Sequence, residues 1–132
     1  MQVLNFYSTI FADELTRGRK TATIRLGDKS GKYRKNQLVL VTIGYQYSPR
    51  HRIFEAVIDH VEVTKLGALS PRDIKHDNPE FRRHDELVSF LENIYGREVS
   101  LDDTVTVVRF SQIIDAPSGV AEALKGFGGA QN

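Results

Sequence analysis

Residues 37–45 are the segment that most restricts what this chain can fold into. They read Gln-Leu-Val-Leu-Val-Thr-Ile-Gly-Tyr and are almost unbroken in apolar and β-branched residues. A strand with one face in water alternates apolar and polar residues, whereas a continuous apolar run indicates a strand covered on both faces. We therefore expect residues 37–45 to form a core strand that the rest of the fold covers.

Four further segments are predicted as strands, and regular helical crossovers do not join them. The longest, residues 51–65, loses its apolar alternation near Ala56-Val57-Ile58, which indicates a bulge or a bend. Strands connected in this way favour a mixed or antiparallel sheet over a doubly wound parallel one. We predict an α+β fold, with a small, partly closed barrel and flanking helices. The other predicted strands are residues 3–7, 21–26 and 104–110.

Capping residues mark three predicted helices. The first is capped by Ser8 or Thr9 and runs to about residue 17, where Gly18 supplies the left-handed conformation that ends a helix. Ser70-Pro71-Arg72-Asp73 has the serine cap and early proline that begin a short second helix. Asn78-Pro79-Glu80 is typical of a third start, which opens an amphipathic helix that Gly96 ends.

The length of 132 residues suits one domain, and no linker divides the chain. We expect a single domain over residues 1–114 and a partly disordered tail over 115–132, where Gly, Ala, Ser and Pro are frequent. The first residues lack the pattern of a signal peptide, and no apolar run approaches the roughly 18 residues that cross a membrane. A cytoplasmic location without a membrane partner is therefore expected.

The residue types present argue against a metal or cofactor site. There is no cysteine, and the four histidines form no H-x-x-x-H pair. A zinc site needs three or four converging ligands. Walker, G-x-S-x-G and G-x-G-x-x-G motifs do not occur. We expect no metal and no cofactor.

The segment Gly18-Arg-Lys-Thr-Ala-Thr-Ile-Arg25 is the main candidate for a functional site. In a strand over residues 21–26, Thr23 and Arg25 share one face, and Lys20 stands where the strand begins. Thr23 can act as a nucleophile if a base removes its proton, and Lys20 can be that base if its pKa falls from about 10.4 toward neutrality. Burial or the nearby cations Arg19 and Arg25 would lower this pKa. Arg25 can instead hold a developing oxyanion or a phosphate, and the structural alternative is a strand with solvated charges.

Hydrolysis of an amide also needs a proton shuttle to the leaving amine, usually a carboxylate. Glu80 is one candidate. Its place after Pro79 also has a structural explanation, because a helix dipole favours an acidic residue in the first turn by roughly 0.3–1 kcal/mol. Asp73 and Asp77 have the same kind of alternative explanation.

Basic residues are concentrated between Arg17 and Lys35, where eight lysines and arginines face Asp28 alone. A second basic group occupies residues 50–52. Basic clusters with interspersed aromatic residues are typical of grooves that bind single-stranded nucleic acid. The alternative is a solubilising face with ordinary packing tyrosines. The tyrosines among or beside the clusters are Tyr33, Tyr45 and Tyr47.

The segment from Gly18 to Arg25 resembles the signature of the ASCH superfamily, G-x-K-x-x-x-x-R, which lies between the first helix and the strand that follows it. The resemblance extends over about residues 5–113, through the predicted strands and the helix that ends at Gly96. It implies a PUA-like β-barrel, a fold associated with RNA binding. The chain is most similar to small bacterial ASCH enzymes that hydrolyse N4-acetylcytidine to cytidine and acetate.

By position, the resemblance implies that Lys20, Thr23 and Glu80 are catalytic and that Arg25 is the motif arginine. Arg25 would bind substrate, as would three neighbouring candidates, Arg19, Tyr33 and Tyr47. The expected function is hydrolysis of an acylated pyrimidine nucleoside. The chain departs from those enzymes in a longer basic loop at residues 27–36, in Asn78-Pro79 before the glutamate, and in its tail.

The alternative function is an RNA-binding ASCH module, with or without metal-independent ribonuclease activity on single strands. The basic loop and the tyrosines would then contact the RNA. The expected partner is accordingly either a nucleoside or single-stranded RNA.

Overall fold

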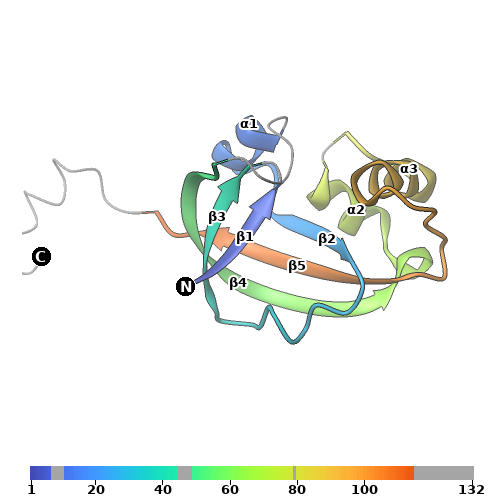
Figure 1. Cartoon of the computed structure of the whole chain (residues 1–132), viewed down its shortest axis with the longest axis horizontal. Coiled ribbons are helices and arrows are strands. Elements are labelled where there is room, and N and C mark those ends of the chain that lie inside the picture. Colours follow the sequence, from blue (N-terminus) through green and yellow to red (C-terminus); the bar gives the residue numbers. More distant parts are fainter. Residues whose placement is uncertain (7–10, 45–48, 79, 115–132) are drawn as a thin grey trace, which may run out of the picture.

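One curled sheet of five strands dominates the computed structural model, which describes residues 1–6, 11–44, 49–78 and 80–114 (Figure 1). Its strands are β1 (Gln2–Phe6), β2 (Ala22–Leu26), β3 (Leu38–Ile43), β4 (His51–Lys65) and β5 (Thr104–Gln112). The helices are α1 (Phe11–Thr16), α2 (Pro71–Asp77) and α3 (His84–Tyr95), with a 3-10 turn at Leu66–Ala68. The predicted tail lies outside the described residues.

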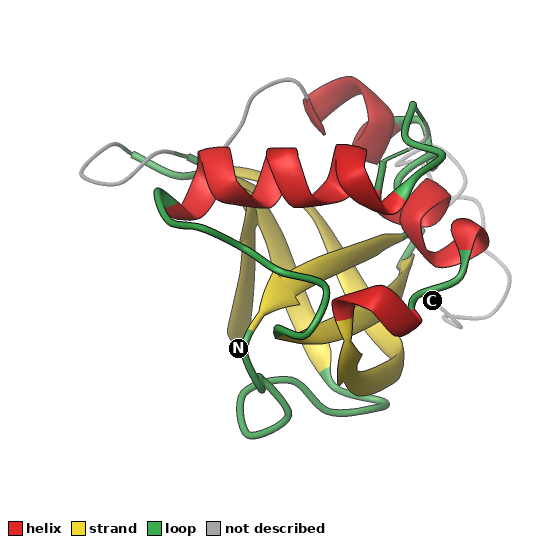
Figure 2. Ribbon diagram, turned by 90° about the vertical axis from the view of Figure 1, so that its right-hand side faces the viewer, coloured by secondary structure: helices red, strands yellow, loops and turns green. Residues whose placement is uncertain are grey.

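The strand order across the sheet is β1-β3-β4-β5-β2. Strand β1 pairs parallel with β3, and the other neighbours pair antiparallel. The sheet is thus a half-barrel whose two edges are β1 and β2, and the helices lie to one side of it in Figure 2. This confirms the predicted α+β fold with a mixed sheet and flanking helices. Among the described residues, no helix has the length and apolar character needed to cross a bilayer.

Strand β3 lies between β1 and β4, as its apolar sequence predicts. Val39, Val41 and Ile43 are buried, but Leu38 at the beginning of the strand is 51% exposed. Val39, Val41 and Ile43 share one face of the strand. On the other face Leu40 is half-buried and Thr42 is buried, so coverage on both faces is confirmed only at the end of β3 and is wrong for its beginning. Strand β4 bends as expected, since its register with β5 shifts between Ile58 and His60, just after the predicted place.

The core has two parts, which correspond to the two halves of the curled sheet. One part packs α1 against β1, β3 and β4, and the other packs α2 and α3 against β2 and β5. Phe90 of α3 packs against both parts. The large buried side chains of the first part include Leu4, Phe11, Val41 and Ile58, and those of the second include Ile24, Ile74, Leu87 and Val107.

The caps of α2 are those that the sequence predicts. The Ser70 hydroxyl accepts the backbone N–H of Asp73, and the Asp73 carboxylate accepts the N–H of Ser70, with Pro71 as the first helical residue. This reciprocal pair satisfies two N–H groups that a helix start leaves free. The aspartate that ends the helix, Asp77, is therefore held at a fixed place relative to Ser70.

The predicted start of α3 is wrong, because the helix begins at His84 and not after Asn78. The Glu86 carboxylate accepts the backbone N–H groups of Arg82 and Arg83, which stabilises an extended conformation at Arg83. Glu80 therefore belongs to a turn before the helix. The end of α3 at Gly96, with φ +65°, is as predicted.

Gly18 and Gly31 provide a matched test of the turn that leads into β2. Both have free space where a Cβ would be, but only Gly18 is left-handed, with φ +74°. Gly18→Ala should lower the free energy of unfolding by about 1–2 kcal/mol, because an L residue is strained there. Gly31→Ala should be neutral or slightly stabilising, because it restricts only the unfolded chain. Urea denaturation measures both, and equal effects would contradict this account.

Candidate functional site

Lys20 of the motif is buried, with 2% of its surface exposed. Its ammonium nitrogen donates to the backbone carbonyl of Asp77 and lies 3.1 Å from Asp77 Oδ1. The rings of Phe6 and Phe11 are 5.1 and 4.6 Å from the same nitrogen. Buried lysines are rare unless they are paired, so Asp77 and the two rings account for its presence here.

Burial lowers the pKa of Lys20 below its ordinary value of 10.5. The carboxylate of Asp77 opposes this change, and the positive charge of Arg25 adds a smaller effect in the same direction as burial. The net lowering is what a lysine needs in order to act as a base. Desolvation is the main cause, whereas the sequence suggested both burial and neighbouring cations.

Asp77 connects the motif to α2, of which it is the last residue. Its Oδ1 accepts from Lys20 and, at 2.9 Å, from the backbone N–H of Ile24 in β2. Its Oδ2 is buried and has no hydrogen-bond partner among the described residues. An aspartate at the end of a helix is disfavoured by the helix dipole, so its contacts with Lys20 and Ile24 explain its place better than helix capping does.

Thr23 and Arg25 lie side by side on β2, on the face that the sequence predicts. Arg25 Nε donates to Thr23 Oγ1 at 2.9 Å, and Arg25 Nη2 donates to the backbone carbonyl of Asn5 at the same distance. The guanidinium also lies 5.0 Å from the ring of Phe6. Because Thr23 accepts from a cation, its own proton remains to be donated, and the adjacent positive charge favours an ionised oxygen.

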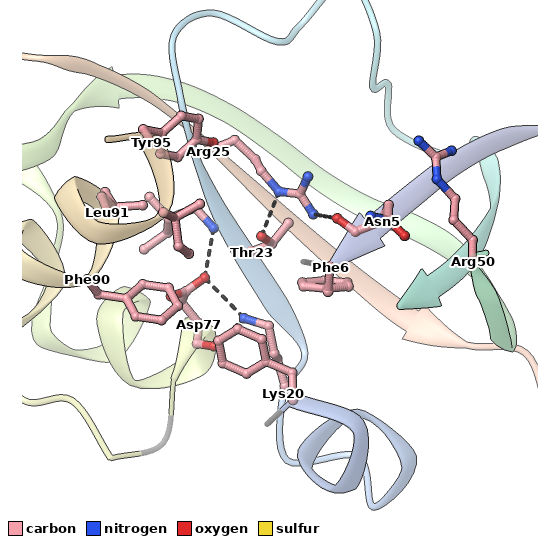
Figure 3. A pocket seen from close by; sticks show the side chains of 13 residues that line it. Asn5, Phe6, Lys20, Thr23, Arg25, Arg50, Asp77, Phe90, Leu91 and Tyr95 are labelled. Atoms are coloured by element: carbon pink, nitrogen blue, oxygen red, sulfur yellow. Dashed lines mark hydrogen bonds and ion pairs between the residues drawn. The ribbon is translucent and has the colours of Figure 1, made fainter. Parts of the chain in front are cut away.

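These side chains line one pocket of about 880 Å³. This volume lies within the usual range for small-molecule sites. Figure 3 shows Thr23 between the Lys20–Asp77 pair and Arg25, with Asn5 and Arg50 farther along. The wall is partly apolar and aromatic. The lining residues are Asn5, Phe6, Phe11, Lys20, Thr23, Ile24, Arg25, Arg50, Asp77, Phe90, Leu91, Ile94 and Tyr95.

Strand β2 is an edge of the sheet, and the helices supply partners for its outward N–H groups. Ile24 donates to Asp77 of α2, and Leu26 donates to the Tyr95 hydroxyl of α3 at 3.3 Å. Just before the strand, the N–H of Thr21 donates to a backbone carbonyl of α2, that of His76. Two of these partners, Asp77 and Tyr95, also line the pocket.

The pocket brings together three of the predicted site residues, Lys20, Thr23 and Arg25. Arg19 does not line it; its side chain is exposed and lies 3.4 Å from Glu14. Tyr47 lies outside the described residues.

Two other predicted site residues lie away from the pocket. Glu80 is exposed, and the described contact it makes is a backbone one, from its N–H to Asn78 Oδ1. The carboxylate that reaches Lys20 is that of Asp77. Tyr33 is buried in the core, where its hydroxyl donates to the carbonyl of Val3 at 3.3 Å, so it does not present a stacking surface.

Sequence reasoning missed the role of Asp77 and the presence of Asn5, Arg50 and Tyr95. The available signal for Asp77 was an acidic residue in the last turn of a helix, where the dipole disfavours it. No group of three or more His, Cys, Asp or Glu side chains that could hold a metal ion occurs in the described part of the chain.

Removal of the Asp77 carboxylate should destabilise the fold in a pH-dependent manner. Asp77→Ala leaves a buried ammonium without its counter-charge, so we expect a loss of about 3–5 kcal/mol near neutral pH. The folded protein loses the Lys20 proton at lower pH than the unfolded chain, so the free energy of unfolding rises with pH between the lowered pKa and 10.5. Asp77→Ala lowers the pKa of Lys20 further, so the free energy of unfolding of the variant should begin to rise at a lower pH than that of wild type. The difference in free energy of unfolding between the two proteins should therefore shrink in alkali.

Urea denaturation over an alkaline pH series measures this effect. The matched control is Asp85→Ala, which removes a carboxylate from an exposed pair with Arg83. It should cost little at any pH, since exposed ion pairs contribute little. A deficit for Asp77→Ala that does not change with pH would contradict the role assigned to Lys20.

Comparisons with known proteins identify the fold. No protein-family model and no curated protein matches the chain. Among solved structures, the ASCH domain of Lactobacillus crispatus JV V101 is 16% identical, with a TM-score of 0.62 over 84% of this chain and 79% of that one. A DUF984 protein of Enterococcus faecalis V583 is 14% identical, with a TM-score of 0.62 over 85% and 79% of the two chains. A hypothetical protein is 13% identical, with the same score over 86% and 100%. The chain therefore has the fold of the ASCH domain.

Proposed function

We propose that this protein hydrolyses the amide of an acylated pyrimidine nucleoside such as N4-acetylcytidine. The observation that carries the proposal is a buried lysine of lowered pKa that shares a pocket with a threonine bound to an arginine. This combination provides a base, a nucleophile and a positive charge for a developing oxyanion. The resemblance of residues 18–25 to the ASCH signature supports the same chemistry.

In the first half of the reaction, neutral Lys20 takes the hydroxyl proton of Thr23, and Thr23 Oγ1 bonds to the acyl carbon. The carbonyl oxygen becomes an oxyanion, which a free N–H of Arg25 stabilises. The carbon–N4 bond then breaks, and the N4 nitrogen takes the proton from the Lys20 ammonium. Cytidine leaves, and the acyl group remains as an ester of Thr23.

In the second half, Lys20 takes a proton from water as the water oxygen bonds to the ester carbon. Arg25 again stabilises the oxyanion. The bond from carbon to Thr23 Oγ1 breaks, Thr23 regains a proton from Lys20, and the carboxylic acid is released. Lys20 thus takes and returns one proton in each half, so its lowered pKa serves both steps.

We assign Asp77 the place that sequence position gave to Glu80. Asp77 fixes the Lys20 ammonium through Oδ1 and its backbone carbonyl, whereas Glu80 is exposed. The carboxylate also keeps the pKa of Lys20 from falling further. Asp77 is therefore a positioning residue for the base, and the proton to the leaving amine comes from Lys20.

Incubation with N4-acetylcytidine, with chromatography for cytidine, tests the proposal. Wild type should release cytidine, and Lys20→Ala and Thr23→Ala should each lose at least about 100-fold in kcat/KM. Asp77→Asn should lose activity and shift the alkaline rise of kcat/KM to lower pH, because loss of the carboxylate lowers the pKa of Lys20. Glu80→Gln should stay within about twofold of wild type. No turnover by wild type, or equal turnover by Lys20→Ala, would refute the proposal.

Binding of single-stranded RNA is a second candidate function, which the exposed basic side chains of the loop at residues 27–36 favour. The loop carries one acidic residue, Asp28, whose carboxylate accepts from Ser30 and leaves the loop with an excess of positive charge. Affinity should fall with salt, with a log–log slope of about −0.7 for each phosphate contact. Neutralising the loop cations should make the slope shallower, and a slope near zero would exclude this mode. An RNA cleavage assay without metal tests for ribonuclease activity. The loop cations are Lys29, Lys32, Arg34 and Lys35.

A further inference from the structure

The charges that line the pocket do not balance within the described part of the chain. The Lys20 and Asp77 charges compensate each other at 3.1 Å. Arg25 and Arg50 remain, and no carboxylate among the described residues lies within ion-pair distance of either. Six other arginines do have such a carboxylate. They are Arg17, Arg19, Arg52, Arg83, Arg97 and Arg109.

Arg25 is half-buried and is held by two neutral acceptors, the Thr23 hydroxyl and the Asn5 carbonyl. A guanidinium carries five N–H donors, so others remain for a ligand. The proposed reaction uses this charge on a transient oxyanion beside Thr23. Arg50 has no such use, since Figure 3 places it beyond Asn5 and farther from Thr23.

The backbone of Arg50 is fixed next to the pocket. Its Cα packs so closely on Gly44 that a Cβ added there would lie 2.9 Å away. Gly44 in turn is tied to β1, because its N–H donates to the carbonyl of Phe6 and its carbonyl accepts from the Asn5 amide, both at 3.0 Å. The exposed guanidinium of Arg50 therefore extends from an anchored position at one end of the pocket.

The opposite end of the pocket has an unused acceptor. Asp77 Oδ2 is buried without a hydrogen-bond partner among the described residues, and such a carboxylate oxygen is costly to leave unpaired. In the view of Figure 3, Asp77, Thr23, Arg25, Asn5 and Arg50 follow one another from one side to the other.

We propose that the ligand is a nucleoside monophosphate, with its exocyclic amide at the end of the pocket that holds Thr23 and Asp77 and its phosphate on Arg50. This inference rests on the proposed function, because it places the amide of an acylated cytosine beside Thr23. It adds that the 5′-monophosphate of the nucleoside is bound in preference to the free nucleoside. A phosphate monoester supplies the negative charge that Arg50 lacks, and arginine binds phosphate through two N–H groups.

Calorimetric titration with cytidine 5′-monophosphate and with cytidine tests the phosphate site without any turnover. Wild type should bind the monophosphate on the order of tenfold more tightly. Added salt should weaken binding of the monophosphate and leave binding of cytidine almost unchanged, since only the monophosphate carries charge. Arg50→Gln should reduce the preference to within about twofold. Circular dichroism shows whether this exposed substitution leaves the fold intact.

The control is Arg52→Gln, which removes a neighbouring exposed arginine that pairs with Glu55 and does not line the pocket. It should keep the full preference. Equal binding of the two ligands by wild type, a preference that survives Arg50→Gln, or no binding of either ligand would overturn the inference. Binding of a cytidine oligonucleotide without a terminal phosphate, but not of the monophosphate, would overturn it in favour of RNA.

The two proposals fail in different ways. Hydrolysis of N4-acetylcytidine with no preference for the monophosphate would leave the proposed function standing and remove the phosphate site. The opposite result is a clear preference for the monophosphate that Arg50→Gln abolishes, with no hydrolysis of N4-acetylcytidine or of its 5′-monophosphate. It would leave the phosphate site standing and refute the proposed function.

Discussion

The buried pair of Lys20 and Asp77 is the interaction on which the arrangement of this molecule depends. The two residues are far apart in the sequence, and their contact joins the segment before β2 to the end of α2. Removal of two charges from water is costly, and the attraction between them offsets this cost only when the remaining polar atoms are also satisfied. Here the backbone N–H of Ile24 and the carbonyl of Asp77 take part, while Asp77 Oδ2 has no partner among the described residues. The pair therefore specifies one position of α2 against the sheet.

The pocket lies where the two parts of the core meet. Phe6 and Phe11 come from the first part, and Leu91 comes from the second. Such a junction provides apolar walls together with the polar ends of strands and helices. Lys20 is desolvated by this location, and the same location makes its proton easier to remove. Burial of Lys20 thus costs stability and at the same time makes the side chain a better base.

Much of this could be predicted from local sequence. The caps at Ser70 and Gly96 follow from the hydrogen-bonding groups and backbone freedom of those residues, and they are where the pattern indicates. The face of β2 that carries Thr23 and Arg25 follows from strand alternation. Local sequence marks Asp77 only as an acidic residue in the last turn of a helix. Its pairing with Lys20 could not be found in this way, because tertiary packing brings the two together. Tyr33 was predicted to contact substrate but is buried in the core. The local sequence of a tyrosine in a basic loop does not show whether its ring is exposed or buried.

The edge of β2 has a consequence for motion in the pocket. A sheet edge normally needs a further strand, a charge or a bulge to prevent pairing with another chain. In this molecule the covering groups are two pocket residues, Asp77 and Tyr95, on two different helices. Any movement of α2 or α3 that widens the pocket uncovers strand donors. Access for a ligand and resistance to self-association are therefore in competition, which favours a preformed site over one that opens.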